Sequence, residues 1–182
     1  EYCLVYSKNI NILSSIHSEN KWAVEKNNIH EYKKRVEILK NKGLTDEDIT
    51  QELKELTKYP RFIDFTNYWY FDNRGVYAKA DLGGVTNGNM EPIFNPLTNQ
   101  YDPIPPGGFR YKKEKLEQLI DNNRIHFHRD GSLPRLKRYL EENLKQRPKS
   151  IMSDDQRPDN TMLKNMGLSF DNPKQLAFIK RI

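Results

Sequence analysis

The stretch from Tyr68 to Asp81 reads YWYFDNRGVYAKAD and carries the clearest strand signal in the chain. Aromatic residues and valine flank the tetrapeptide DNRG, a pattern that predicts an antiparallel hairpin with glycine at its turn. The hairpin combines aromatic side chains with the cations Arg74 and Lys79, a mixture that suits stacking on nucleobases and contact with phosphates. The aromatic residues are Tyr68, Trp69, Tyr70, Phe71 and Tyr77. Packing inside the protein is the alternative for about half of these rings.

Two amphipathic helices are predicted before this hairpin. The apolar residues of the first recur at helical spacing between residues 22 and 40, and Gly43 lies where a helix commonly ends. Thr45 and Asp48 have the spacing of a capping box, which predicts the start of the second helix. We expect an antiparallel helical hairpin without catalytic residues. Its apolar positions are Ile29, Tyr32, Val36 and Leu39 in the first helix and Ile49, Leu53 and Leu56 in the second.

The elements expected after the aromatic hairpin are shorter. Glycine, asparagine and proline dominate residues 83–108, which predicts a long loop. We expect a helix from Lys112 to Ile120, a short strand from Arg124 to His128, and a helix that can begin at Pro134. Residues 149–160 predict a polar surface loop, and residues 2–6 a buried strand. Together these elements predict the α+β class, with small antiparallel β elements and basic helices beside the helical hairpin.

The net positive charge is concentrated in one segment. Between Phe109 and Arg147, Lys and Arg exceed Asp and Glu by eleven to six, and this surplus equals the net charge of +5 of the whole chain. Such an asymmetry is typical of a surface that faces phosphates, although a solvated helix face has the same composition. Arg110, Lys112 and Lys113 lie at a predicted helix start, where a bound phosphate would offset their unfavourable interaction with the helix dipole.

Two histidines share one face of the predicted strand RIHFH, residues 124–128. Alternation places Arg124, His126 and His128 on that face and Ile125 and Phe127 on the other. Two histidines could begin a zinc site, but zinc needs further ligands, and the remaining His and Cys residues lack suitable spacing. We expect no metal. Contact with phosphates or bases is one interpretation of this polar face, and a solvated strand face is the other.

No catalytic centre is expected from these residues. The chain has no phosphate-binding glycine loop and no serine in a nucleophile elbow. The single cysteine, Cys3, excludes an internal disulfide and fits a reducing compartment. No secretion leader or apolar run of membrane-spanning length occurs in the sequence, so we expect a cytoplasmic protein without a membrane partner. Because the sequence opens inside a strand pattern and closes inside a helical pattern, we also expect a piece of a longer protein.

Four stretches resemble the middle of adenine-specific DNA methyltransferases, above all the modification subunits of type III restriction-modification systems. They are EYCLVYSKN at residues 1–9, YPRFIDFTNYWYFDNRGVYAKAD at 59–81, PPGGFRYKKEKLEQLIDNNRIHFHRDGSLPRLKRYLEE at 105–142 and SFDNPKQLAFIKRI at 169–182. The resemblance implies a bacterial protein that reads a DNA site while the parent enzyme transfers a methyl group from S-adenosylmethionine to adenine N6. The Asp-Pro-Pro-Tyr tetrapeptide and the Phe-x-Gly-x-Gly loop of that family are absent from these 182 residues, so we expect no activity and no bound S-adenosylmethionine for this piece alone.

The resemblance divides the chain into four parts. Residues 1–16 are similar to the edge of the catalytic domain, 17–60 form a helical hairpin insert, 61–166 the target-recognition region, and 167–182 the helix before the S-adenosylmethionine loop. It implies Tyr2 and Tyr6 near the flipped adenine and Phe170, Pro173 and Lys174 near the cofactor. Together with the charge pattern, it gives these expected DNA contacts: Arg74, Arg110, Lys112, Lys113, Arg124, His126, His128, Arg135, Lys137 and Arg138.

Several partners follow from this interpretation. Double-stranded DNA and the rest of the methyltransferase chain come first, and a restriction subunit or a second copy are further possibilities. Two other functions stay open at this point. The chain is a protein-interaction module if the helical hairpin binds a partner and the basic patch is incidental, or an RNA-binding domain if unpaired RNA binds better than duplex DNA.

Overall fold

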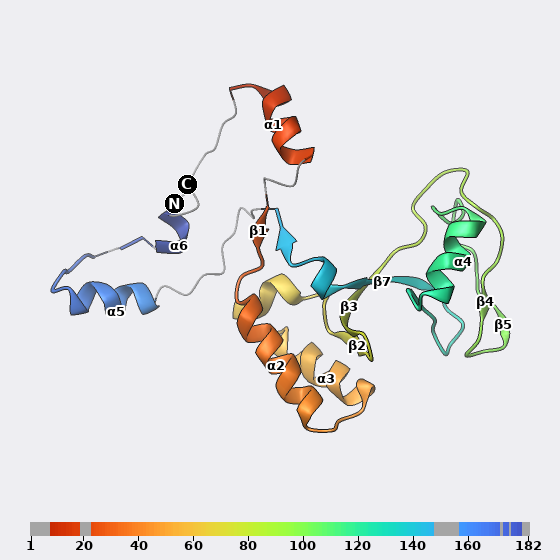
Figure 1. The fold of residues 1–182 in the computed structure, drawn as a ribbon, viewed down its shortest axis with the longest axis horizontal. Coiled ribbons are helices and arrows are strands. Elements are labelled where there is room, and N and C mark those ends of the chain that lie inside the picture. Colours follow the sequence, from red (N-terminus) through yellow and green to blue (C-terminus); the bar gives the residue numbers. More distant parts are fainter. Residues whose placement is uncertain (1–7, 19–22, 148–156, 172, 175, 180–182) are drawn as a thin grey trace.

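The computed structural model describes residues 8–18, 23–147, 157–171, 173–174 and 176–179. Helices and small antiparallel sheets make up these ranges, which confirms the predicted α+β class. Figure 1 shows two lobes joined by long strands, one lobe built of helices and the other of a helix with loops and a short hairpin.

A four-stranded antiparallel sheet joins the lobes, in the order β2-β3-β7-β6. Strands β2 (Tyr70–Asp72) and β3 (Gly75–Ala80) form the aromatic hairpin that the sequence predicted, with Asp72 opposite Gly75. The inner strand β7 (Arg135–Tyr139) pairs with β3 on one side and with β6 (Ile125–His126) on the other.

The prediction of a helix from Pro134 is wrong, because these residues enter strand β7. The sequence RLKRYLEE has no feature that forbids a helix, and its conformation is set by backbone pairing with β3 across more than fifty residues of chain. Long-range pairing of this kind overrides local propensity. In a strand, Arg135 and Arg138 lie on opposite faces of the sheet, so they do not form one basic surface.

The helical hairpin is confirmed. Helices α2 (Ile29–Asn41) and α3 (Asp46–Leu56) bury the apolar stripes predicted for them, except that Leu56 is only partly buried. The capping box of α3 is formed, since the Asp48 amide donates to the Thr45 hydroxyl at 3.2 Å and the Thr45 amide donates to the Asp48 carboxylate at 3.4 Å. Gly43 adopts a φ of 68° between the helices, a left-handed conformation that glycine accepts without strain.

The core of this helical lobe is aromatic. The 3₁₀ segment η1 (Pro60–Phe65) supplies Phe62 and Phe65, and the ring of Tyr32 stacks on Phe65 with centroids 4.2 Å apart. Phe71 and Val76 of the sheet pack into the same cluster. One face of the sheet thus closes the helical lobe.

A second core lies at the other end of the sheet. Its buried members are Leu82, Ile93, Phe109, Leu116 and Ile125, with Leu116 supplied by helix α4 (Lys113–Asp121). Residues 83–108, predicted as a loop, also contain a short hairpin of β4 (Phe94–Asn95) and β5 (Gln100–Tyr101). Phe109 pairs with Asn89 through backbone hydrogen bonds of 2.8 Å in both directions.

The remaining described elements lie toward the two ends of the sequence. Helix α1 (Ile10–Ser18) forms in a polar stretch for which no element was expected, and β1 (Val24–Glu25) pairs with β8 (Lys145–Gln146). Helix α5 (Arg157–Asn165) begins inside the loop predicted for residues 149–160, and α6 (Leu176–Ile179) is a short part of the predicted final helix. The strand predicted for residues 2–6 lies outside the described residues.

The helical lobe makes a direct stability prediction. Leu53→Ala removes a side chain with no exposed surface from the core of α3 and leaves a cavity, so the free energy of unfolding should fall by about 2 to 5 kcal/mol. Urea unfolding followed by circular dichroism measures it. Ile38→Ala on α2, where the side chain is 40% exposed, should cost less than about 1 kcal/mol; equal losses would contradict this packing.

Candidate nucleic-acid interface

Cross-strand pairing gathers rings and cations on one face of the four-stranded sheet. Opposed residues of an antiparallel pair lie on the same face, and the register places Tyr77 opposite Tyr139 and Lys79 opposite Lys137. We call this the aromatic-basic face. Its members are Tyr70, Tyr77, Lys79, His126, Arg135, Lys137 and Tyr139.

Asp72 organises the centre of this face. Its Oδ2 atom accepts from the Lys137 ammonium at 2.8 Å and from the Tyr139 hydroxyl at 2.8 Å. The Lys137 ammonium also donates to the Asn123 side chain at 3.0 Å, and the lysine is buried. A buried cation needs such a partner. Lys137, expected to contact DNA, therefore holds the sheet together and does not face solvent.

Two of the expected DNA-contacting arginines are held by one carboxylate. Arg124 donates to both oxygens of Glu142, at 2.6 and 2.7 Å, and Arg74 donates to one of them at 2.7 Å. The hydrogen bond with Arg124 lowers the pKa of Glu142, and the same bond raises the pKa of Arg124. Both guanidinium groups also lie over the Tyr139 ring. Contacts within the protein thus neutralise much of the positive charge of these two arginines.

The two histidines of the predicted strand do come together, as neutral groups. Their ring centroids are 4.8 Å apart, and the His126 Nδ1 atom is 2.8 Å from the Tyr77 hydroxyl. Burial, with the positive charge of Lys79, lowers the pKa of His126 to about 3. Burial and Lys79 also lower the pKa of His128. Neutral imidazoles can hydrogen-bond to a ligand, but they add no charge with which to attract phosphate.

An open pocket of about 520 Å³ lies beside these histidines. We call it the Lys79 pocket; it is lined by Tyr70, Lys79, His128, Ser132, Leu133 and Arg135. The Lys79 ammonium lies 3.9 Å from the centroid of the Tyr70 ring. Burial, followed by the charge of Arg135, lowers the pKa of Lys79 to about 8.

The Lys79 pocket lacks an anion close to its lysine. Among the residues that the structure describes, no carboxylate forms an ion pair with Lys79, and Asp130 acts on it only at longer range. Arg135 pairs with Asp81 at 3.3 Å, in an ion pair that solvent reaches. Because the two cations repel each other here and the exposed Asp81 pairs with Arg135 and not with Lys79, a bound phosphate would lower the electrostatic energy of the pocket.

The aromatic rings offer less stacking surface than the sequence suggested. Phe71 and Tyr77 are buried, which confirms core packing for part of this set. Tyr70 is half-buried, and its ring contacts Trp69, with centroids 3.8 Å apart, as well as Lys79. Cations, rather than open ring faces, are therefore the main groups that this surface presents to a ligand.

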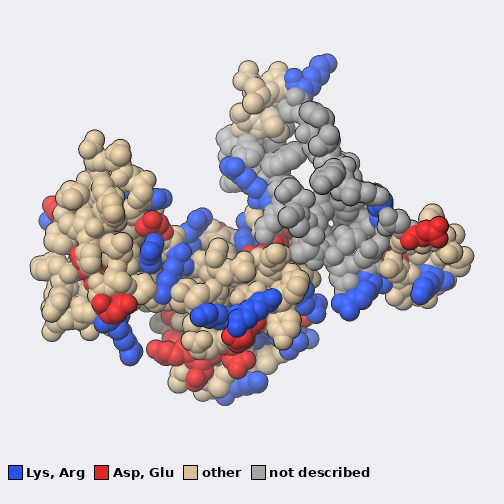
Figure 2. Space-filling model, turned by 180° about the vertical axis from the view of Figure 1, so that it is seen from behind, with Lys and Arg blue, Asp and Glu red and all other residues tan. Residues whose placement is uncertain are grey.

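The other predicted contacts lie apart from the aromatic-basic face. The Arg110 guanidinium donates to the Gly83 carbonyl at 3.0 and 2.7 Å, Lys112 precedes α4 and is exposed, and Lys113 pairs with Glu91 at 3.1 Å. Arg138 lies on the opposite face and reaches Asn143 at 3.3 Å. Figure 2 shows Lys and Arg side chains gathered between the lobe of α4 and the lobe of α2 and α3.

The residues implied near the adenine and the cofactor are only partly described. Tyr2 and Tyr6 lie outside the described residues. Phe170 and Lys174 are exposed and Pro173 is half-buried, all three before the short helix α6.

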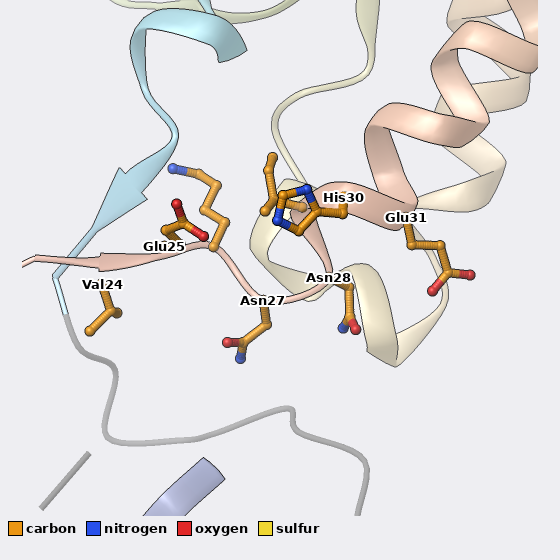
Figure 3. Close-up of a pocket in the computed structure, with 8 residues that line it drawn as sticks. Val24, Glu25, Asn27, Asn28, His30 and Glu31 are labelled. Carbon is orange, nitrogen blue, oxygen red and sulfur yellow. The ribbon is translucent and has the colours of Figure 1, made fainter. Parts of the chain in front are cut away.

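A second hollow, of about 530 Å³, is lined by residues 24–31. Its polar side chains do not converge on one point: Figure 3 shows Asn27, Asn28 and Glu31 pointing away from His30. Lys26 is buried beside it, and its ammonium donates to the backbone carbonyls of Asn143 and Lys145. We therefore assign this hollow to the junction of β1, β8 and α2.

Two classes of site are not found in the described part of the chain. No three His, Cys, Asp or Glu side chains there are grouped so that they could hold a metal ion. None of the described helices is long and apolar enough to cross a membrane.

Ser132, Asp72 and Glu142 were not among the residues that the sequence suggested, whereas Lys79 was named there as a cation of the aromatic hairpin. Strand alternation in VYAKAD could have placed Lys79 beside Tyr77, whereas the partnership of Asp72 with Lys137 depends on sheet register. No protein-family model matches this sequence, and comparison with curated proteins finds no significant match.

The pKa of Lys79 can be measured directly. We expect its side-chain NMR signals to titrate at about 8, and Arg135→Gln should raise that pKa because it removes a neighbouring positive charge. Arg138→Gln, which removes a cation of the same strand from the opposite face, should leave the value unchanged. An unaltered pKa in Arg135→Gln would contradict the geometry of the pocket.

Because His126 is half-buried as a neutral group, we expect the folded protein to lose stability in acid. Its folded pKa of about 3 lies below the ordinary 6.5, so only the unfolded chain binds this proton between the two values. The free energy of unfolding should therefore fall as pH drops from 6.5 toward 3, by at most about 1.4 kcal/mol per pH unit for this group. His126→Gln should flatten the dependence in urea unfolding series; a slope equal to that of the unaltered protein would contradict the burial of this ring.

Proposed function

We propose that this chain binds double-stranded DNA through its aromatic-basic face. The observation that supports the proposal best is the Lys79 pocket, where Lys79 and Arg135 lie together beside an open volume. Contacts from Lys and Arg to phosphates supply most of the affinity of non-specific DNA binding. The concentration of the net charge between Phe109 and Arg147 supports the same reading.

We further propose that the chain is the target-recognition region of an adenine-N6 DNA methyltransferase, of the kind found in type III restriction-modification systems. The four sequence stretches that resemble this family support it, since two of them include the sheet that carries the Lys79 pocket. In such an enzyme, S-adenosylmethionine supplies the methyl group. The expected partners are the rest of the methyltransferase chain, a restriction subunit and a second copy, in the bacterial cytoplasm.

The role of this chain in methylation would be to hold the duplex. An adenine inside a base pair has to leave the stack before its N6 atom can react, at a cost of a few kcal/mol. Cations that bind the backbone fix the register of the duplex against the catalytic groups. The neutral His126 and His128 beside the pocket can add hydrogen bonds without further charge.

DNA titrations test the proposal. A fluorescently labelled duplex of mixed sequence should bind in anisotropy measurements at low salt. Lys79→Ala and Arg135→Ala should weaken binding, and each should lower the slope of log affinity against log salt by about one for each lost phosphate contact. Arg138→Ala, on the opposite face of the same strand, should change the slope less.

The controls separate this proposal from its alternatives. Lys58→Ala removes an exposed lysine that pairs with Glu55 on α3, and it should leave the slope unchanged. Circular dichroism verifies that each variant is folded. Equal effects of Arg135→Ala and Arg138→Ala would contradict binding at the aromatic-basic face. Binding to a restriction subunit without binding to DNA would favour a protein-interaction module, and tighter binding to unpaired RNA would favour an RNA-binding domain.

A further inference from the structure

The segment that precedes the basic stretch of residues 109–147 is almost without charge. From Leu82 to Phe109 the only charged residues are Glu91 and Asp102, in a chain of which 30% is charged. Asp102 is buried, and Glu91 pairs with Lys113 at 3.1 Å. The surface of this segment is thus nearly neutral, although it lies next to the Lys79 pocket.

A hairpin in this segment presents apolar side chains to solvent. Strands β4 and β5 place Phe94 opposite Tyr101, with ring centroids 5.6 Å apart. Pro96 and Leu97 lie in the turn between the strands and are exposed, Leu97 to 55%. Figure 1 shows this hairpin at the end of the molecule farthest from α5.

The hairpin is held firmly at its base by Asn95, which has no exposed surface. The Asn95 amide donates to Asp102 at 2.8 Å and to the His128 carbonyl at 2.9 Å, and its side-chain oxygen accepts from the Leu97 amide at 2.9 Å. The Asn99 amide closes the turn on the Asn95 carbonyl at 3.0 Å. The apolar tip is therefore fixed by a buried polar network, and these contacts do not bury Leu97 itself.

The same asparagine links the hairpin to the proposed DNA-binding surface. His128, whose carbonyl it binds, lines the Lys79 pocket. A neutral apolar tip therefore lies beside a cationic pocket. A duplex has the complementary arrangement, because its stacked apolar bases lie between two rows of anionic phosphates. Proline, leucine and phenylalanine are typical of the wedges that proteins insert between base steps.

We propose that the β4–β5 hairpin is a wedge that inserts Leu97, supported by Pro96, into the base stack of a duplex whose backbone is held at the Lys79 pocket. The inference rests on the proposed DNA binding and adds to it a local unstacking of bases. The absence of exposed acidic groups on the hairpin allows its approach, because a carboxylate at the tip would be repelled by the phosphates. Unstacking costs a few kcal/mol per base step, which the backbone contacts offset.

Fluorescence of 2-aminopurine tests the wedge, because this base emits more strongly when it is unstacked. Duplexes that carry 2-aminopurine at successive positions are titrated with the full chain, and anisotropy of a labelled end reports binding in the same samples. We expect the fluorescence to rise at one or two adjacent positions. Leu97→Ala should lose at least about half of that rise and weaken binding by about tenfold or less, with an unchanged salt slope. The exposure of Leu97 makes unfolding by this substitution unexpected.

A matched control variant and three possible results separate the wedge from its alternatives. Met90→Ala changes an exposed apolar residue of the same nearly uncharged segment outside the hairpin, and it should keep the full fluorescence rise. Binding without any rise, or an equal rise in Leu97→Ala, would overturn the wedge and leave the proposed function intact. Failure to bind duplex at low salt would overturn both. A dimer in sedimentation that Leu97→Ala abolishes, without a change in 2-aminopurine, would instead assign the hairpin to contact with a second copy.

Discussion

The contact between the Asp72 carboxylate and the Lys137 ammonium, 2.8 Å long and largely buried, is the interaction on which the rest of the structure depends. It joins the end of β2 to the inner strand β7, and Tyr139 of the same strand donates to the same oxygen. Removing one partner of such a pair commonly costs about 3 to 5 kcal/mol, since the other charge is left buried alone. This pair therefore determines which side chains of β7 lie on the aromatic-basic face. It also explains why a lysine in the most basic part of the chain is unavailable to a ligand.

The positive charge of this surface divides into two groups with different roles. Arg74 and Arg124 share Glu142 and lie over Tyr139, so they stabilise one end of the sheet. Lys79 and Arg135 lie at the other end and line an open pocket, where Arg135 pairs with the exposed carboxylate of Asp81. The net charge of the whole chain, +5, does not show which cations pair within the protein and which face the pocket. The distinction depends on which acids the fold brings close, and it reduces the expected contact set to a small pocket.

Local patterns predicted the elements that local interactions stabilise. The helical hairpin, its capping box at Thr45 and Asp48, and the aromatic hairpin around DNRG depend on neighbours within a few residues. Strand β7 was mistaken for a helix because its backbone partners in β3 lie more than fifty residues away. The β4–β5 hairpin was hidden in a loop-like composition, because the buried side chain of Asn95 stabilises it without an alternating apolar pattern. Of the residues that line the Lys79 pocket, the sequence suggested Lys79, His128 and Arg135, whereas their position on one face next to each other depends on the register of the sheet.

Lysine footprinting with and without duplex DNA tests the central claim most directly. A lysine with a pKa near 8 is largely reactive as a free amine at mildly alkaline pH, so Lys79 should be labelled readily in the free protein. Duplex DNA should protect Lys79 from the reagent, while Lys58 on the helical lobe keeps its labelling. Equal labelling of Lys79 in the presence and absence of bound duplex, or protection confined to the lysines of α2 and α3, would contradict it.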